Sequence, residues 1–393
     1  MVGIMLFAKL NDLSIGGKGS YGIAASAVER KADLPTYLRI TDIFDDGTLN
    51  LSELKSVDAP NSDKYILKPN DIVFARTGGS TGRNYFYDGS DGVFVYAGFL
   101  IKFSIDPEKV NPKYVKYYCR SKQYNDWVQS FNTGSTRGNI NAQTFGNMEI
   151  PLPERKQQDY LVSILEPIDE KIKNNKQVND NLQQQAFSVF DNLIANAENN
   201  DCTVSDYAFL NPKRTLAKNQ VSRSIDMSQL STSGAFPSGW EMKPFNGGMR
   251  FTNGDTLLAR ITPCLENGKT AFIDFLDDGE VAFGSTEYIV LAPKNDTPPE
   301  MLYCLARYPA FVDYAVKNMN GSSGRQRVSA ETVGQYRLPL FDKHSLVLFK
   351  EVVSPMFLKM RYNSLENMRL AELRDALLPK LMSSEINVSA VQL

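Results

Sequence analysis

The chain has 393 residues, of which 42% are apolar and 22% charged, values typical of a soluble globular protein with two or three domains. The formal net charge of −2 provides no overall basic footprint, which counts against a nucleic-acid binder. Any phosphate contact must then come from local clusters or from a partner. No apolar run is long enough for a membrane span, and no basic region precedes the first apolar residues. We therefore expect no membrane segment, no signal peptide and a cytoplasmic location. The four cysteines lie too far apart for a metal knuckle or a disulfide framework.

Residues 1–150 are rich in β-prone runs separated by Gly, Asn and Asp, which predicts a first sheet-containing domain. The runs are TYLRI (36–40), DIVFAR (71–76), NYFYDG (84–89) and GVFVYAGFLIKFS (92–104). A helical pattern with aromatic residues on one face follows at residues 112–129. We interpret this aromatic face as core packing rather than as a platform for stacked bases.

Three loops of this first domain mix glycine with basic and amide residues: Ser14–Gly22, Arg76–Asn84 and Asn132–Asn139. Glycine allows the backbone to come close to a partner, while Arg, Lys and Asn supply donors for phosphates and base edges. A solvated turn is the plain alternative for any one of these loops. Their number in one domain favours nucleic-acid contact only modestly.

A long helical stretch begins after Pro151, and we expect Pro167 to split it into a short helix and a long one from Asp169 to Ala197. From Leu161 to Leu193 the seam positions follow an unbroken four-three spacing, which keeps one stripe of a helix facing a partner helix. Two neighbouring seam positions, Asn175 and Asn179, are polar.

A shift of 188 residues maps this seam onto a second one, from Phe349 to Leu381, and places the two asparagines on Asn363 and Asn367. The upstream segments also repeat, since NDIVFAR (70–76) matches GDTLLAR (254–260) and residues 132–152 match residues 320–340. Between these matches the two halves share little identity. The chain therefore contains two copies of one unit, each ending in a long helix.

Signatures of catalysis are missing from the sequence. His344 is the only histidine, which argues against a Ser-His-Asp triad or a histidine metal site. Gly268-Lys269-Thr270 resembles the end of a phosphate-binding loop, but Pro263 stands where the first glycine is needed and a strand-like run follows. The tetrapeptide that an amino-methyltransferase uses to hold a flipped base is absent. We therefore expect a protein that is not an enzyme.

The duplicated pattern resembles the specificity subunit of type I restriction-modification systems over nearly the whole chain. Its most specific stretches are ILEPIDEKIKNNKQVNDNLQQQAF (164–187) and ARITPCLENGKTAF (259–272), together with NDIVFAR, GDTLLAR and the Pro-Leu junctions before the long helices. The resemblance implies an α+β fold, in which a pair of long antiparallel helices separates two α/β target-recognition domains related by a pseudo-twofold. It places these domains at residues 1–150 and 200–338 and the helices at residues 151–199 and 339–385.

The resemblance also implies partners. They are double-stranded DNA with a split site, two modification subunits that bind S-adenosylmethionine and methylate adenine, and, in the full nuclease, two restriction (motor-nuclease) subunits. The chain itself would hold no cofactor and no metal. A helix from Asp169 to Ala197 would be about 43 Å long, at about 1.5 Å per residue. That length corresponds to about 13 base pairs of duplex between two half-sites.

We predict that Asn175, Asn179, Asn363 and Asn367 fix the register of the two helices through one shared polar layer, because a buried polar seam residue is stable only when its partner can hydrogen-bond it. Contact with solvent or with a methyltransferase subunit is the alternative. Replacing Asn175 and Asn363 together with leucine should then raise thermal stability and loosen the DNA spacing.

For DNA contact we predict basic and amide side chains of the glycine-rich loops and their counterparts: Lys18, Arg76, Arg83, Asn84, Arg137, Asn139, Arg250, Arg260, Arg325, Gln326 and Arg327. Arg76 and Arg260 repeat in both halves, so we expect them to position the backbone or form an ion pair, while the divergent loops discriminate bases. Two rival hypotheses are a self-contained DNA methyltransferase and a coiled-coil DNA-binding assembly factor.

Overall fold

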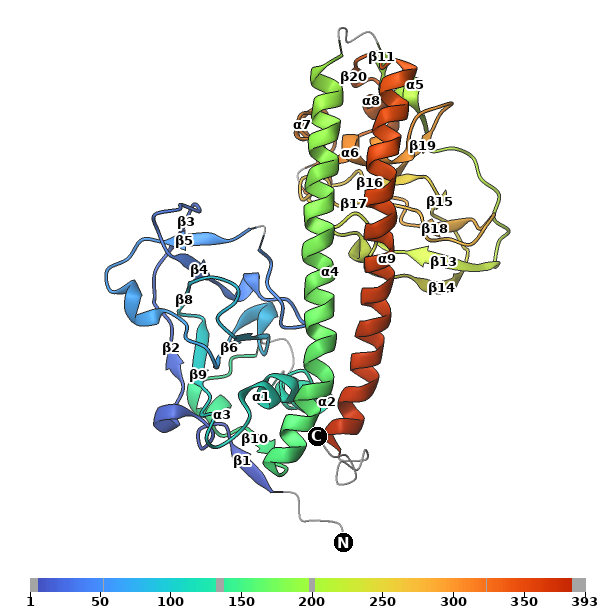
Figure 1. The fold of residues 1–393 in the computed structure, drawn as a ribbon. Coiled ribbons are helices and arrows are strands. Elements are labelled where there is room, and N and C mark those ends of the chain that lie inside the picture. The colour runs from blue at the N-terminus through green and yellow to red at the C-terminus, as the bar shows by residue number, and fades with distance from the viewer. Residues whose placement is uncertain (1–5, 52, 132–137, 198–201, 323, 384–393) are drawn as a thin grey trace. The chain divides into compact units, whose positions relative to one another are not determined.

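The computed structural model describes residues 6–51, 53–131, 138–197, 202–322 and 324–383. The chain divides into two compact units (Figure 1): unit 1 combines Met1–Asp169 with Leu373–Leu393, and unit 2 is Glu170–Glu372. These units group residues by their contacts, and each unit contains a sheet-rich part together with segments of the long helices. The predicted domains instead separate the sheet-rich parts from the helices at residues 150, 199, 338 and 385, and these bounds stay a prediction. Within the described ranges, no helix combines the length and the apolar character that crossing a membrane requires.

Unit 1 is built on a sheet whose central strand β6 (Asp71–Ala75) is buried at every position. This strand pairs antiparallel with β9 (Leu100–Ser104) and with β7 (Asn84–Tyr87), and a second sheet contains β4 and β8 as a parallel pair. The β-prone run at 92–104 contains two strands, β8 and β9, because the chain turns at residues 98–99. The other strands of unit 1 are β1 (Phe7–Lys9), β2 (Ser20–Tyr21), β3 (Ala27–Val28), β4 (Thr36–Leu38), β5 (Lys55–Val57), β8 (Phe94–Tyr96) and β10 (Glu149–Pro151).

The aromatic face predicted at 112–129 belongs to two short helices, α1 (Pro112–Tyr118) and α2 (Lys122–Gln129). The side chains of Asn111 and Ser121 cap them by accepting backbone N–H groups of the first turn. The aromatic side chains are buried in the core of unit 1, so the interpretation as core packing is confirmed: Tyr114, Tyr117, Tyr118 and Tyr124. The short helix α3 (Ala142–Gly146) completes this part.

Unit 2 repeats this plan with different strand lengths. Its central strand β16 (Thr256–Ala259) pairs antiparallel with β19 (Tyr288–Pro293) and with β17 (Thr270–Phe272), and β13 pairs in parallel with β18. The strand expected after Gly268-Lys269 is therefore β17. The other strands are β11 (Cys202–Thr203), β12 (Ala208–Leu210), β13 (Val221–Ile225), β14 (Glu241–Pro244), β15 (Met249–Phe251), β18 (Ala282–Gly284) and β20 (Arg337–Leu338). The short helices are α5 (Val204–Tyr207), α6 (Pro299–Arg307), α7 (Pro309–Lys317) and α8 (Ala330–Gly334).

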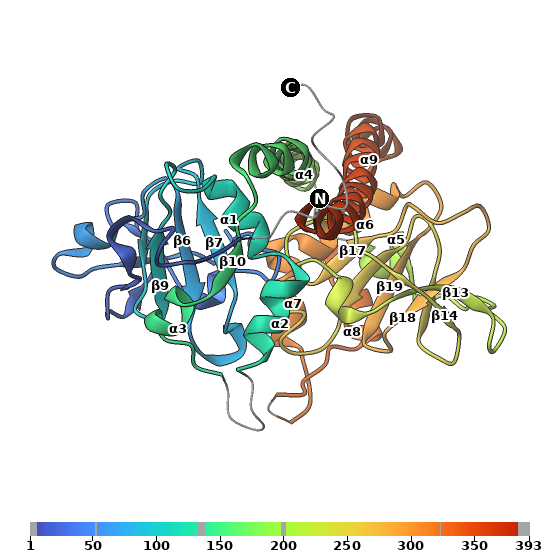
Figure 2. The ribbon, with the colours of Figure 1, turned by 90° about the horizontal axis from the view of Figure 1, so that it is seen from below.

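Helix α6 connects the sheet of unit 2 to the long helices. It packs on β16, β17 and β19, while its other side shares one buried cluster with residues of the long helices α4 (Arg155–Ala195) and α9 (Lys343–Met382). Figure 2 shows α6 between β17 and α9. In unit 1, α1 has the corresponding place beside β7, and the buried cluster there includes residues of α1 and of both long helices.

The two long helices are α4 (Arg155–Ala195, 41 residues) and α9 (Lys343–Met382, 40 residues). Helix α4 continues through Pro167, so the expected break before Asp169 is wrong. A proline in a helix interior costs about 3 kcal/mol because it removes one backbone hydrogen bond. Buried seam residues on both sides, Leu165 before it and Asn175 after it, hold the helix through this position.

In unit 2 the helices α4 and α9 pair antiparallel through the predicted asparagines. The Asn175 amide donates to Asn367 Oδ1 at 2.9 Å and to Glu366 Oε2 at 2.7 Å, and the Asn363 amide donates to Asn179 Oδ1 at 2.8 Å. A shift of 188 residues exchanges the two pairs. The structure therefore contains the hydrogen bonds of the predicted polar layer; their role in fixing the register stays a prediction.

These hydrogen bonds change the expected effect of leucine at two of the four positions. Replacing only Asn175 and Asn363 leaves Asn367 and Asn179 with their partners removed, at about 1–3 kcal/mol for each stranded group. We therefore expect the double variant to be less stable and the fourfold leucine variant to be at least as stable as the natural chain. Thermal unfolding of both variants tests this, and a double variant with a raised melting temperature would contradict the pairing.

In unit 1 the N-terminal part of α4 packs against the C-terminal part of α9. The contacting residues in the core cluster are Leu161, Leu165, Leu378 and Leu381. Beside this cluster, Asp169 of α4 accepts from Arg120 at 2.7 Å. Its carboxylate also pairs with Lys116 of α1 at 3.1 Å and with Arg374 of α9 at 3.2 Å. One carboxylate thus joins three cations from three segments of unit 1. We name these four residues the Asp169 cluster.

Candidate nucleic-acid interface

The described parts of the three glycine-rich loops of unit 1 meet around Arg76, which follows β6 directly; of the third loop only residues 138–139 are described. The Arg76 N–H donates to the Phe99 carbonyl at 3.1 Å, and the Ile140 N–H donates to the Arg76 carbonyl at 2.9 Å. The Arg76 guanidinium lies over the Tyr21 ring, 5.2 Å from its centroid, and the Tyr21 hydroxyl accepts from the Ala142 N–H at 3.2 Å. The described parts of loops that the sequence predicts separately therefore lie together.

Unit 2 has the same backbone hydrogen bonds around Arg260, which follows β16. We call each arginine with its two backbone hydrogen-bond partners a frame. The Arg260 N–H donates to the Glu287 carbonyl at 3.0 Å, and the Val328 N–H donates to the Arg260 carbonyl at 3.0 Å. An isolated bridge pairs Ile261 with Arg327, as another pairs Thr77 with Asn139 in unit 1. By these contacts Phe99 corresponds to Glu287, and Asn139 corresponds to Arg327.

Arg76 and Arg260 share one further property. The Nε atom of each is buried and has no hydrogen-bond partner among the residues that the structure describes. A buried N–H without an acceptor is costly, so this arrangement is held by the surrounding contacts of each arginine. Arg223 Nε of β13 is orphaned in the same way, so this feature alone does not identify a ligand, and the DNA contact of Arg76 and Arg260 stays a prediction.

The other predicted residues of unit 1 fall into two groups. Lys18 and Asn139 are exposed, whereas Asn84 is only 8% exposed and its amide donates to the Cys119 carbonyl at 3.1 Å, which ties β7 to the end of α1. Arg83 Nε and Nη2 donate to the Asp45 carboxylate at 2.6 and 3.2 Å. The predicted contact Arg137 lies outside the described residues. The DNA role of all of these residues stays a prediction.

In unit 2, Arg325 is exposed and Gln326 is half-buried, with its N–H donating to Thr262 Oγ1 at 3.2 Å. Arg250 of β15 lies over the Phe245 ring at 5.7 Å, so one face of its guanidinium is covered. Arg327 is paired with Glu287, and the hydrogen bond from Arg327 is the main reason that the pKa of Glu287 lies below its usual range. Glu287 is therefore ionised at neutral pH.

Four residues of these two sites, three in unit 1 and one in unit 2, were missed from the sequence: Tyr21, Asp45, Phe99 and Glu287. Phe99 and Glu287 could have been found by extending the NDIVFAR and GDTLLAR match to the next strands, because each residue directly precedes the strand that pairs with the central one. No comparable signal marks Asp45 or Tyr21.

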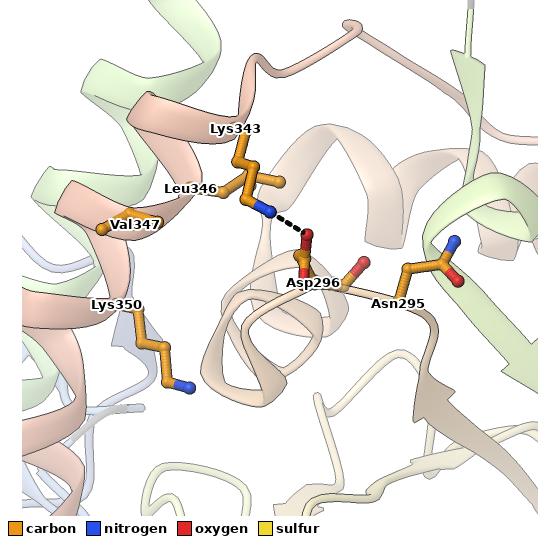
Figure 3. A pocket seen from close by; sticks show the side chains of 7 residues that line it. Asn295, Asp296, Lys343, Leu346, Val347 and Lys350 are labelled. Atoms are coloured by element: carbon orange, nitrogen blue, oxygen red, sulfur yellow. Dashed lines mark ion pairs between the residues drawn. The ribbon is translucent and has the colours of Figure 1, made fainter.

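A pocket of about 210 Å³ beside the start of α9 is a separate feature of unit 2 (Figure 3). Its lining includes the ion pair between Lys343 and Asp296, at 2.9 Å, and contains neither cysteine nor histidine. Among the described residues, no group of three or more His, Cys, Asp or Glu side chains could hold a metal ion. The glycine-rich surfaces therefore remain the candidate site.

Comparison with known proteins identifies relatives of the chain. Residues 29–184 match the family model of the type I restriction modification DNA specificity domain. Over 93% of its length the chain is 23% identical to the type I restriction enzyme HindI specificity subunit of Haemophilus influenzae, covering 98% of that protein. Over 72% of its length it is 21% identical to the MjaIX specificity subunit of Methanocaldococcus jannaschii, covering 71% of it.

A solved structure has the same fold. The type I restriction-modification system S subunit from M. genitalium superposes with a TM-score of 0.55 at 17% identity, with 96% of each chain covered. This likeness concerns the fold alone, and with it the expected fold class is confirmed: sheet-rich parts with a long helix α4 that packs against α9.

Proposed function

We propose that this chain, whose residues 29–184 match the type I restriction modification DNA specificity domain, is a type I specificity subunit that binds a two-part DNA site through its two sheet-rich parts and docks two adenine-methyltransferase subunits. In this proposal the chain recognises the DNA sequence, and its partner subunits catalyse the reaction. S-adenosylmethionine binds the modification subunits, and in a full nuclease two restriction subunits join the complex.

The observation that carries this proposal is the duplicated frame around Arg76 and Arg260. Each frame places an arginine with an orphaned Nε donor next to glycine-rich or basic loops. A partly exposed arginine beside a loop whose backbone can approach a partner closely suits a phosphate, and two such arrangements in one chain suit two half-sites. Because the net charge is −2, these local groups rather than the overall field attract the duplex.

Methylome sequencing of cells that carry this chain with its methyltransferase partner tests the proposal. We expect methylated adenines at one two-part sequence with a constant gap, and no such pattern when this chain is left out. S-adenosylmethionine bound to the isolated chain, or methylation without a partner, would instead favour a self-contained methyltransferase. DNA-independent assembly with unselective duplex binding would favour an assembly factor.

Arg76→Ala and Arg260→Ala are each expected to weaken DNA binding by the complex without changing its sequence preference. A plot of log K against log salt concentration has a negative slope, and loss of one phosphate contact reduces the magnitude of this slope by about 1. Lys64→Ala is the matched control, because Lys64 is an exposed cation of unit 1 outside these loops. Gel-shift titrations at several salt concentrations measure the slopes, and an equal slope for all three variants and the natural chain would contradict the assignment.

A further inference from the structure

Arg327 is held in one orientation by the carboxylate of Glu287. Its Nε donates to the two Glu287 oxygens at 3.0 and 2.8 Å, and its Nη2 donates to Oε1 at 2.7 Å. Its Nη1 donates to the Arg325 carbonyl at 3.1 Å. The guanidinium is a planar group with five N–H donors in a fixed fork. These contacts therefore fix the plane of the guanidinium as well as its position.

The backbone under both residues is fixed as well. Arg327 exchanges two backbone hydrogen bonds with Asn320, both of 2.9 Å, and forms a bridge with Ile261. The Glu287 N–H donates to Ser285 Oγ at 3.1 Å, and its carbonyl accepts from the Arg260 N–H. Arg327 is thus presented from a hydrogen-bonded frame and not from the tip of a free loop.

Each terminal nitrogen of Arg327 retains one N–H group without an acceptor among the described residues, because each has two N–H groups and one is used. The side chain is 39% exposed, so a ligand can reach part of the guanidinium. Two donors in one plane match a ligand that presents two acceptors in that plane. In the major groove of duplex DNA, guanine presents O6 and N7 in this way.

We propose that Arg327 recognises a guanine in the half-site bound by unit 2 and that Glu287 is its positioning residue. This inference rests on the proposed DNA-binding function and names the base edge that one frame contacts. Glu287 also explains why a base is favoured over a phosphate. Its negative charge offsets the attraction between Arg327 and phosphate, while the fixed plane adds the directionality that base recognition needs.

Unit 1 has a different pair at the equivalent backbone positions. Asn139 stands for Arg327, and Phe99, which is 58% exposed, stands for Glu287. This pair contains neither an arginine nor a carboxylate that could hold one. Asparagine pairs with the N6 and N7 atoms of adenine rather than with guanine. The backbone frame is the same in both units, but the residues at these two equivalent positions differ. The two half-sites can therefore differ in the base that is bound next to them.

The test uses the complex with its methyltransferase subunits and a library of randomised duplexes, from which the preferred site is selected. Each guanine of that site is then replaced in turn by 7-deazaguanine, which lacks the N7 acceptor. We expect one guanine whose replacement weakens binding of the natural complex. We expect Arg327→Ala to reduce discrimination between guanine and the other bases at that position by about 5- to 150-fold, and 7-deazaguanine to have no further effect on this variant.

Three variants make the result specific. Arg327→Lys keeps the charge but not the fork, so it should not restore discrimination. Glu287→Gln keeps the size of the side chain and should reduce discrimination at the same guanine only. Arg325→Ala removes a neighbouring exposed cation, and we expect it to weaken binding equally for every base at that position.

Two outcomes would overturn the inference. One is that Arg327→Ala weakens binding while leaving the relative affinities for the bases unchanged, which would make Arg327 a phosphate contact. The other is that no guanine is sensitive to 7-deazaguanine in the natural complex, a result that needs no variant and so does not depend on folding. If the natural complex selects no sequence from the library, the proposed function itself fails, which separates the two failures.

Discussion

Replacing Asp169 with alanine is expected to lower the free energy of unfolding of unit 1 by about 3–5 kcal/mol, because breaking a buried ion pair strands its partner. Arg120, Lys116 and Arg374 all lie within 3.2 Å of this carboxylate, whose side chain is only 14% exposed. Removing Asp169 leaves these three cations close together in a partly buried site. Their mutual repulsion adds to the loss of the ion pairs.

Calorimetric unfolding of the full chain measures this effect. Asp126→Ala is the matched control, because Asp126 forms an exposed ion pair with Lys122 in α2 and its loss should change stability by less than about 1 kcal/mol. Equal losses for the two variants would show that the Asp169 cluster contributes no more than an ordinary surface pair.

The pH dependence of the same variant has a defined sign. Burial alone would raise the pKa of Asp169, but the charges of Arg120, Lys116 and Arg374 outweigh it and hold the pKa at about 2, below the ordinary value of 3.8. A carboxyl whose pKa is lowered on folding stabilises the fold above its ordinary pKa and loses this contribution as the pH falls toward the folded value. The stability difference between the natural chain and Asp169→Ala should therefore be full above about pH 5 and shrink between about pH 4 and pH 2.

The pairing of the long helices could be predicted from the sequence because the seam spacing is a property of each helix alone. The positions that the four-three spacing selects near its two ends, Leu161 and Leu381, do pack in one cluster, and the asparagines do face one another. Pro167 is where this reasoning failed. A rule about proline considers one turn of helix, whereas packing along both flanking segments decides whether that turn survives.

The glycine-rich loops could be identified from composition, but their shared frame could not. The contact between Arg327 and Glu287 joins residues forty positions apart and depends on the pairing of β16 with β19. Local spacing contains no information about such a contact. For the same reason the sequence suggested Asn84 as a DNA contact, although its position at the start of β7 directs its amide to the Cys119 carbonyl.

The contacts between the short helices and the long helices could not be predicted from the sequence either, because the two copies have different residue types at equivalent positions. Asp169 of α4 corresponds to Phe357 of α9, 188 residues later, and Lys116 of α1 corresponds to Tyr303 of α6, when each short helix is counted from its first proline. The ion pair in unit 1 is thus a ring contact in unit 2, with centroids 5.5 Å apart. Comparing the two sequences position by position shows two mismatches, whereas the structure shows one exchange, of an ionic pair for an aromatic pair.

Phe357→Ala is accordingly expected to destabilise unit 2 by about 3–5 kcal/mol, as expected for removal of a buried phenyl ring. Phe357 is 1% exposed, and its ring contacts those of Phe272 at 5.2 Å and Phe236 at 6.5 Å in addition to Tyr303. The neighbouring Leu358 is 42% exposed, so Leu358→Ala is a matched control with an expected change below about 0.5 kcal/mol.

The two variants should differ in their response to solution conditions even though their expected losses are similar. The loss from Phe357→Ala arises from apolar burial, which does not titrate, so it should stay constant as the pH falls from 7 to 3. The loss from Asp169→Ala should shrink at the acid end of the same range. Urea unfolding of both variants at a series of pH values makes this comparison. A pH-dependent loss for Phe357→Ala, or a pH-independent loss for Asp169→Ala, would contradict the exchange of an ionic attachment in unit 1 for an aromatic one in unit 2.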